Sequence, residues 1–221
     1  MNLSSETFNV LKNFSNISPS LVVKTGSTLR TISPMKNIYA KFNAGELFGR
    51  DFALYDLNEF LSGVSLFKDP DFTFDETHVK IKSGRSSVKY FYSDASVITA
   101  PPEKDIDLPS EDVTFQLSDA DLNSLLKASS VYQLSDLSLI SKDGEMLFVV
   151  RDKQNDSSNN FAISVGTTSA NFCFNFKVEN LKILPGVYDV TVSNPNLSVF
   201  RHTSLDLVYW IALEPDSTYE A

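Results

Sequence analysis

The sequence of 221 residues contains one cysteine, Cys173, and two histidines, His78 and His202. A single cysteine excludes an intramolecular disulfide, which fits a protein of the reducing cytoplasm. The longest uninterrupted apolar run, Leu207–Leu213, has seven residues and is too short for a membrane-spanning helix. The first residues lack the basic and then apolar pattern of a signal peptide. These shortages predict a cytoplasmic protein with no membrane partner.

Groups that carry catalysis or bind metals are equally scarce. A catalytic nucleophile needs a base within hydrogen-bond reach. The cysteine lies in an apolar stretch, Phe172–Phe174, that is typical of a core strand, where a free cysteine is usually inert. Gly-x-Ser-x-Gly, P-loop and Gly-x-Gly-x-x-Gly motifs are absent. One cysteine and two histidines do not make a usual zinc site, and acid pairs such as Asp69 and Asp71 are typical of turns. We therefore expect no enzyme activity, no metal and no cofactor.

Positive charge is also in short supply. The 28 Asp and Glu residues outnumber the 19 Lys and Arg residues and give a net charge of −9. The excess lies in residues 100–221, which hold eighteen acids and eight cations, whereas residues 1–99 hold ten acids and eleven cations. A protein this acidic does not coat DNA through a general basic surface. We expect any contact with nucleic acid to come from a small, segregated set of cations.

A boundary is present near the middle of the chain. Three prolines and several acids between Ala100 and Ser110 disfavour helix and predict an extended linker over residues 101–110. The flanking halves, 1–100 and 111–221, resemble each other, because each has an amphipathic helix, strands, a second helix and further strands in that order. A period of about 120 residues is too long for a solenoid repeat and indicates a duplicated helix-and-sheet domain.

Lysines on the polar faces of the expected helices are the main functional signal. Lys12 and Lys127 share their faces with uncharged side chains in the opening helices, and Lys182 lies on the predicted second helix over residues 178–184. Because a solvated face in an acidic protein should carry acids, these lysines indicate cationic helices segregated from acidic sheets. The alternative is that they are ordinary solvated lysines. Weaker candidates lie near the ends of helix-forming segments: Lys68 and Lys177.

Four short segments, unspecific alone, are informative together. They are Leu11–Phe14, Ala53–Leu61, Phe174–Phe176 leading to Leu184–Tyr188, and Ala212–Thr218. Their order and spacing resemble those of the sliding clamps of T-even-like tailed phages, over the whole length of the chain. The stretches that match this family poorly are 25–50, 70–100 and 152–170.

This resemblance implies an α+β fold of two similar clamp-type domains, each with two helices packed on antiparallel sheets. It implies a homotrimer closed head to tail into a ring, with the helices lining the hole. Such a ring encircles duplex DNA without reading its sequence and tethers the replicative DNA polymerase for processive phage DNA replication, after a clamp loader has opened it. In this family the clamp also activates late transcription, with late-transcription factors and the host RNA polymerase as partners. The expected location is the cytoplasm of the infected host cell.

The resemblance further implies a pocket for a partner peptide beside the linker and the C-terminal segment. The residues expected to line it are Ile106, Leu108, Leu213 and Pro215. An exposed apolar cluster with a polar rim is typical of such a groove. The alternative is that Leu108 and Leu213 only pack the linker against the second domain.

Two other functions compete with the clamp. A structural or assembly protein of a virion is also compatible with two similar β-rich domains. A small acidic hydrolase has almost no support from the residues present. Mass in solution separates the first two, because an assembly protein would give a monomer or large polymers instead of a trimer.

Overall fold

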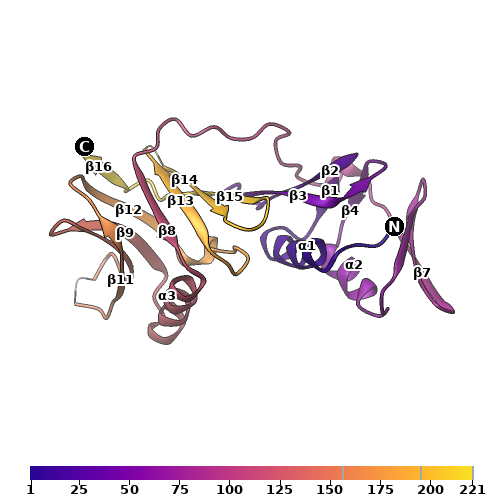
Figure 1. Ribbon diagram of the computed structural model, residues 1–221, viewed down its shortest axis with the longest axis horizontal. Coiled ribbons are helices and arrows are strands. Elements are labelled where there is room, and N and C mark those ends of the chain that lie inside the picture. Colours follow the sequence, from indigo (N-terminus) through magenta and orange to yellow (C-terminus); the bar gives the residue numbers. More distant parts are fainter. Residues whose placement is uncertain (156, 195, 221) are drawn as a thin grey trace. The chain divides into compact units, whose positions relative to one another are not determined.

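The computed structural model describes residues 1–155, 157–194 and 196–220, in two compact units, Met1–Lys104 and Asp105–Ala221 (Figure 1). Each unit is built of antiparallel sheets with helix packed against them. The division after Lys104 lies within the expected linker, and the limits of the two domains stay a prediction. In the described part of the chain, no helix combines the length and apolar character needed to span a membrane.

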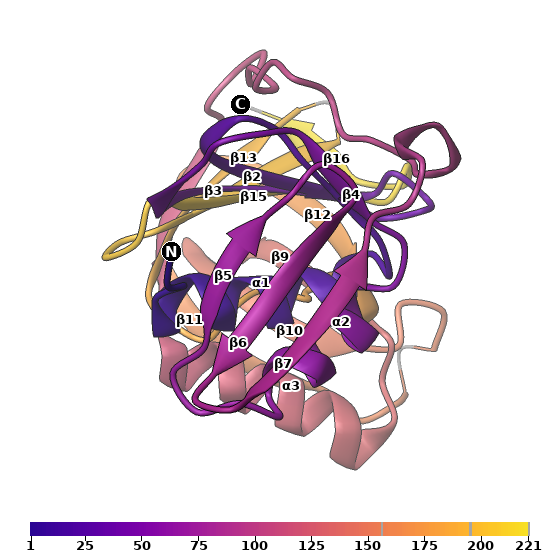
Figure 2. The ribbon, with the colours of Figure 1, turned by 90° about the vertical axis from the view of Figure 1, so that its right-hand side faces the viewer.

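The first unit contains two α-helices, α1 (Ser5–Ile17) and α2 (Leu57–Val64), and a 3-10 turn, Ala95–Val97. Its strands are β1 (Leu21–Val23), β2 (Gly26–Ile32), β3 (Ile38–Phe48), β4 (Phe52–Leu54), β5 (Asp71–Phe74), β6 (His78–Ser83) and β7 (Ser86–Phe91). Strand β1 pairs with β4 and β2 pairs with β3. Strands β5, β6 and β7 form an antiparallel sheet in that order, which Figure 2 shows in front of α1 and α2.

Both helices of the first unit bury the apolar face that their sequences predict. In α1 the buried positions include Val10, Leu11 and Phe14, which recur at helical spacing. In α2 they are Leu57, Phe60, Leu61 and Val64. The ring of Phe60 meets that of Tyr90 edge to face at 5.4 Å, so that α2 packs against β7. Asp56 is the N-cap of α2, since its carboxylate accepts the backbone N–H of Glu59 at 2.8 Å.

The second unit contains one α-helix among its described residues, α3 (Asp119–Tyr132), and a 3-10 turn, Val178–Asn180. Its strands are β8 (Val113–Leu117), β9 (Asp136–Lys142), β10 (Glu145–Arg151), β11 (Phe161–Thr167), β12 (Asn171–Lys177), β13 (Tyr188–Ser193), β14 (Leu197–His202), β15 (Leu207–Ala212) and β16 (Thr218–Glu220). One sheet has the order β11-β10-β9-β12-β16. In the other, β8, β13, β14 and β15 are neighbours in that order.

A chain of phenylalanine rings joins the two sheets of the second unit. Phe115 on β8 contacts Phe148 on β10 at 5.6 Å, and Phe148 contacts Phe176 on β12 at 5.7 Å. Phe176 in turn contacts Phe200 on β14 at 6.4 Å. All three contacts are edge to face, the arrangement that aromatic pairs favour, and Phe148, Phe176 and Phe200 are fully buried. The two sheets therefore share one aromatic core.

The second helix predicted over residues 178–184 is wrong, because only a single 3-10 turn forms there. Burial alternates from Leu181 to Ile183, with Leu181 and Ile183 buried and Lys182 exposed, and this period of two belongs to extended chain. Pro185 also disfavours helical backbone at the residue before it. Each unit thus has a long first helix, and only the first unit has a second α-helix among the described residues.

The start of α1 is fastened to strand β3 by one carboxylate. Glu46 accepts the Thr7 hydroxyl at 2.6 Å and also the backbone N–H of Ser4, the N-cap of the helix. Partial burial disfavours the charge on Glu46, but the hydrogen bonds from Thr7 and Ser4 outweigh it and hold its pKa below the ordinary value. The ionised carboxylate therefore helps to set where α1 begins.

Replacement of Glu46 by alanine should lower the free energy of unfolding by about 1–2 kcal/mol at neutral pH, because two donors lose a charged acceptor. The pKa of Glu46 is lowered in the folded state, so its contribution is present above the ordinary value of about 4.3 and is lost as pH falls through the folded value. Urea unfolding at pH 7 and at about pH 3 measures both effects, with Glu76→Ala, an exposed loop acid, as control. An equal destabilisation by Glu46→Ala at both pH values would contradict this role.

Candidate functional site

The exposed face of α1 carries one lysine among uncharged polar side chains. Asn9, Lys12 and Asn16 are exposed, as the sequence predicts, while the opposite face is buried. The ammonium of Lys12 lies 4.5 Å from the centroid of the Phe8 ring, within cation–π range. The Phe8 side chain thus holds the ammonium of Lys12 near the helix surface, and the lysine keeps its positive charge available.

Helix α3 repeats this arrangement in the second unit. Asn123, Lys127 and Ser130 are exposed, and Leu122 and Leu125 are buried on the other face. Ser118 is the N-cap of α3, because its hydroxyl accepts the backbone N–H of Asp121 at 3.1 Å. Lys12 and Lys127 therefore occupy comparable places on the first helices of the two units.

The remaining three lysines do not lie on α-helices. Lys182 is exposed in the extended segment after the 3-10 turn, which corrects its expected position on a helix. Lys177, at the end of β12, forms an ion pair with the buried carboxylate of Asp136 at 2.5 Å, and hydrogen bonding to Asp136 raises the pKa of Lys177. Lys68 is exposed in the turn after α2. Of the five lysines, only Lys12 and Lys127 project from a helix face.

Two buried tyrosines hold the segment that carries Lys182. The Tyr209 hydroxyl accepts the backbone N–H of Leu184 at 3.1 Å, and the Tyr188 hydroxyl donates to the carbonyl of the same residue. Burial raises the pKa of both phenols far above the usual range, so they stay neutral at all physiological pH values. A Cβ at Gly186 would clash with the His202 ring, so this close approach requires glycine. Lys182 therefore lies on a fixed strap of chain.

The four residues expected at the peptide pocket differ in exposure. Ile106 is 37% exposed, and its carbonyl accepts the indole N–H of Trp210 on β15 at 2.9 Å. Leu108 is half-buried and Pro215 is exposed. Leu213 is 5% exposed and so belongs to the core of the second unit. Of the four, Ile106, Leu108 and Pro215 offer apolar surface, whereas Leu213 offers almost none.

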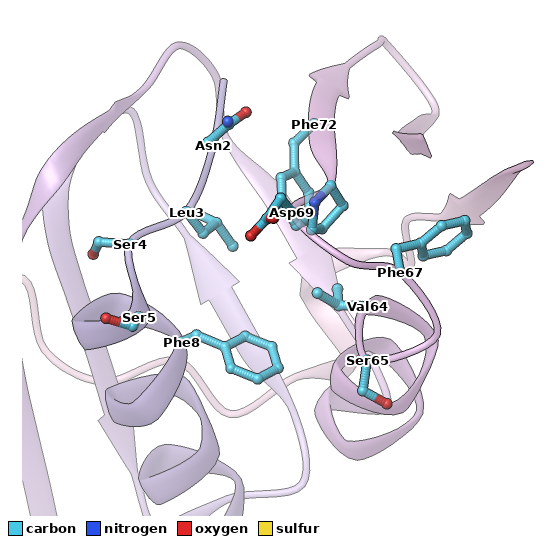
Figure 3. Close-up of a pocket in the computed structure, with 11 residues that line it drawn as sticks. Asn2, Leu3, Ser4, Ser5, Phe8, Val64, Ser65, Phe67, Asp69 and Phe72 are labelled. Carbon is cyan, nitrogen blue, oxygen red and sulfur yellow. The ribbon is translucent and has the colours of Figure 1, made fainter. Parts of the chain in front are cut away.

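A cavity of about 400 Å³ lies beside α1 in the first unit (Figure 3). Its apolar walls include Phe8 from α1, Val64 from the end of α2 and Phe72 from β5. Asp69 is the charged side chain of its lining, and serines form part of the rim. Because Phe8 also contacts the ammonium of Lys12, the wall of this cavity and the exposed face of α1 share one ring.

The reactive side chains serve local structure. The Cys173 thiol accepts a hydrogen bond from the Arg151 guanidinium at 3.2 Å on half-buried sheet surface. His202 accepts the backbone N–H groups of Ser204 and Leu205 at its Nδ1 atom, both at 3.2 Å, which closes the turn after β14. Within residues 1–155, 157–194 and 196–220, no three His, Cys, Asp or Glu side chains gather where they could hold a metal ion.

The expectation of acidic sheets is wrong for the first unit. Lys80, Lys82 and Lys89 all point outward from β6 and β7, so this sheet carries more lysines than α1 and α2 together. The sequence contains the signal for it, because Lys80 and Lys82 alternate with buried Val79 and Ile81.

Solved structures share the arrangement of helices and antiparallel sheets described above. Proliferating cellular nuclear antigen from Entamoeba histolytica matches with a TM-score of 0.67 and 10% identity, over 94% of each chain. The sliding clamp of Bartonella birtlesii, a DNA polymerase III subunit beta, matches with a TM-score of 0.71 and 14% identity, over 97% of this chain and 64% of that chain. The fold is thus that of the sliding clamps, and the predicted α+β clamp class is confirmed.

Sequence comparison narrows the class to a family. Residues 4–100 match the family of DNA polymerase processivity factors, and residues 114–215 match the C-terminal domain of the gp45 sliding clamp. The sliding clamp of Vibrio phage KVP40 is 33% identical over 97% of this chain and 99% of its own. Those of Escherichia phage RB69 and Enterobacteria phage T4 are 32% and 28% identical over the full length of both chains. This chain belongs to the family of phage sliding clamps, and this membership disfavours the virion-assembly alternative.

Proposed function

We propose that this protein forms a closed ring that encircles duplex DNA and tethers the replicative polymerase of a phage during processive synthesis. It acts as a binding scaffold and performs no reaction of its own. The observation that carries the proposal is the pair of exposed lysines, Lys12 and Lys127, on the first helices of the two units. Membership of the sliding-clamp family supports the rest.

The small number of helix lysines suits a protein that slides. Each neutralised phosphate adds to the affinity for DNA and to its salt dependence, so a densely cationic lining would resist movement. A ring is retained by its closure around the duplex and needs little affinity. We propose Lys12 and Lys127 as the main residues facing DNA, with Lys182 on its strap and Lys68 near α2 as further contacts. Lys177 contributes least, because Asp136 already pairs with it.

Reversing the charge of Lys12 and Lys127 together should lower loading and processive synthesis by about an order of magnitude, because the lining becomes repulsive towards phosphate. Primer extension on a long template with the cognate polymerase and loader measures this. Both side chains are exposed, so the protein should stay folded. The control, Lys36→Glu with Lys142→Glu, changes the net charge equally at exposed positions off the helices. Unchanged product length in the Lys12 and Lys127 variant would mean that these faces do not meet DNA.

The ring is proposed to close through the outer strands of unlike sheets. Strand β7 ends the three-stranded sheet of the first unit, and β11 ends the five-stranded sheet of the second. Each leaves a row of backbone N–H and C=O groups without a strand partner among the described residues of its own unit. Pairing β7 of one protomer with β11 of the next is a head-to-tail contact, which generates a ring when the rotation closes.

A trimer of this 24.6 kDa chain should have a mass of about 74 kDa by light scattering at tens of micromolar. Dilution should dissociate the trimer to the monomer. Large polymers should not form at any concentration, because ring closure pairs both outer strands of every protomer. A monomer at tens of micromolar, or a mass that keeps rising with concentration, would contradict the closed ring.

The partner-peptide pocket is proposed around Ile106, Leu108 and Pro215, over Leu213. The linker over residues 101–110 would form one wall of the pocket. Along the sequence, this linker joins the proposed domains 1–100 and 111–221. Its prolines limit the freedom of the unbound chain, which reduces the entropy lost on capturing a peptide. The polymerase would bind through a short tail segment with an apolar anchor. We propose the clamp loader, late-transcription factors and the host RNA polymerase as further partners, in the cytoplasm of the infected cell.

Replacing Ile106 and Leu108 by glutamate should reduce affinity for the tail peptide of the polymerase at least about tenfold, since central apolar anchors carry most of such binding energy. Calorimetry measures it, with Asp107→Ala as a control at an exposed neighbour. Point substitutions are preferable to removing the C-terminus, because β16 pairs with β12 and Tyr219 stacks on Phe174 at 5.9 Å. Wild-type affinity in the glutamate variant would move the site elsewhere.

A further inference from the structure

Figure 2 shows the β5–β6–β7 sheet in front of α1 and α2. The side of this sheet turned away from the helices, its outer side, gathers exposed cations. On the inner side Val79 and Ile81 are at most 1% exposed, so the alternating positions of β6 must face outward. The outward and turn positions of β6 and β7 carry four exposed cations, here called the β6–β7 cationic face: Lys80, Lys82, Arg85 and Lys89.

Two of these lysines oppose each other directly. Lys80 on β6 is the register partner of Lys89 on β7. Side chains opposite each other in an antiparallel pair have Cβ atoms about 4.5–5.5 Å apart, and like charges there destabilise the sheet. Among the described residues, no ion pair involves any of the four cations. The protein itself therefore does not compensate this repulsion.

The need to protect a sheet edge from pairing does not explain all the lysines of the β6–β7 cationic face. Lysines on outer strands prevent sheets from pairing edge to edge, which would explain Lys89 on β7. Lys80 and Lys82 lie on β6, the central strand of the sheet. Cations are also not needed here for solubility, since the chain has a net charge of −9. A sheet that keeps opposed lysines at a cost in stability points to an anionic partner.

The width of the face favours an extended peptide over duplex DNA. The third strand of the sheet, β5, begins with an exposed acid, and a second exposed acid follows its end. Asp71 is the register partner of Lys82, and the Asp75 carboxylate lies 3.3 Å from His78 Nε2. A duplex, whose major groove alone is about 12 Å wide, would bring phosphates onto these acids. A single extended chain fits over β6 and β7, and its alternate side chains recur at about 6.6–6.8 Å, the spacing from Lys80 to Lys82.

An exposed aromatic ring lies beside the lysines. Phe91 is 66% exposed and, as the register partner of His78, continues the outward row that contains Lys89. Its ring lies 5.3 Å from the His78 ring, which holds it against the sheet. Exposed aromatic residues next to cations suit a ligand that combines acidic and apolar side chains.

We propose that the β6–β7 cationic face and Phe91 form a docking surface for an extended acidic segment of a partner protein. Carboxylates of the segment lie on Lys80, Lys82 and Lys89, and an apolar side chain lies on Phe91. The surface uses neither the helix lysines nor the residues around Ile106. It shares β7 with the proposed ring contact, but that contact uses the backbone edge of β7 and not the outward side chains of the strand. It does not depend on the proposed function, because only the outer side of one sheet carries it.

The probe is a fluorescein-labelled peptide of about ten residues in which Glu alternates with Ser around one central Phe. Fluorescence anisotropy with the full chain should show binding that weakens from about 50 to about 200 mM NaCl. Lys80→Glu with Lys89→Glu should lower affinity at least about tenfold. Lys36→Glu with Lys142→Glu, which changes the net charge equally, should stay within about twofold of wild type. Phe91→Ala should weaken binding and leave its salt dependence unchanged.

Three results would overturn the proposal. The first is an equal loss of affinity in both double variants, which would reveal a general effect of net charge. The second is displacement of the peptide by a duplex of about 20 base pairs in the absence of a loader, which would make the face a nucleic-acid surface. The third is a lower mass by light scattering of a Lys80→Glu with Lys82→Glu variant, whose residues lie on β6 and not on the β7 edge proposed to close the ring, which would place the face between copies of this chain. Circular dichroism verifies that each variant is folded, as expected for exposed positions.

Discussion

The packing of one face of each long helix against antiparallel sheet is the contact on which the rest of the structure depends. Helix α1 buries Val10, Leu11 and Phe14, and α3 buries Leu122 and Leu125. Burying these side chains contributes about 1.5–3 kcal/mol each and fixes which face remains exposed. The lysines at 12 and 127 acquire their orientation from this packing, not from contacts of their own. The proposed sliding on DNA would use that division, because each helix would be held firmly by its buried face and attract phosphate only weakly through its exposed face.

The electrostatics of the two units differ, although their folds are related. The second unit holds most of the acids, and its Lys177 and Lys153 are paired with Asp136 and Asp216. In the first unit, lysines gather on β6 and β7 and remain unpaired among the described residues. Duplication supplies two similar frameworks, and divergence at the exposed positions gives them unlike surfaces. Unlike surfaces are what a head-to-tail assembly requires, since the same patch does not meet itself.

Much of this could be predicted from the sequence, where the physical signal is local. The N-caps Ser118 and Asp56 and the apolar stripes of the three helices follow from short-range hydrogen bonding and helical period. The helix expected over residues 178–184 fails because tertiary contacts decide that segment. Seven residues before a proline are too few for a stable helix, and buried tyrosines bind the backbone of Leu184 instead.

The candidate site was harder to predict than the fold, because a lysine has the same local signal whether it faces DNA, solvent or an acid. Lys177 illustrates this limit: its partner Asp136 lies 41 residues away in sequence and becomes adjacent only when β12 pairs with β9. Leu213 shows the same for apolar residues, since only the folded sheet reveals that it is buried. The pairing register of the strands decides which residues become neighbours, and local sequence patterns do not give it. It brings Lys80 opposite Lys89, and that opposition gives two unremarkable lysines a physical meaning.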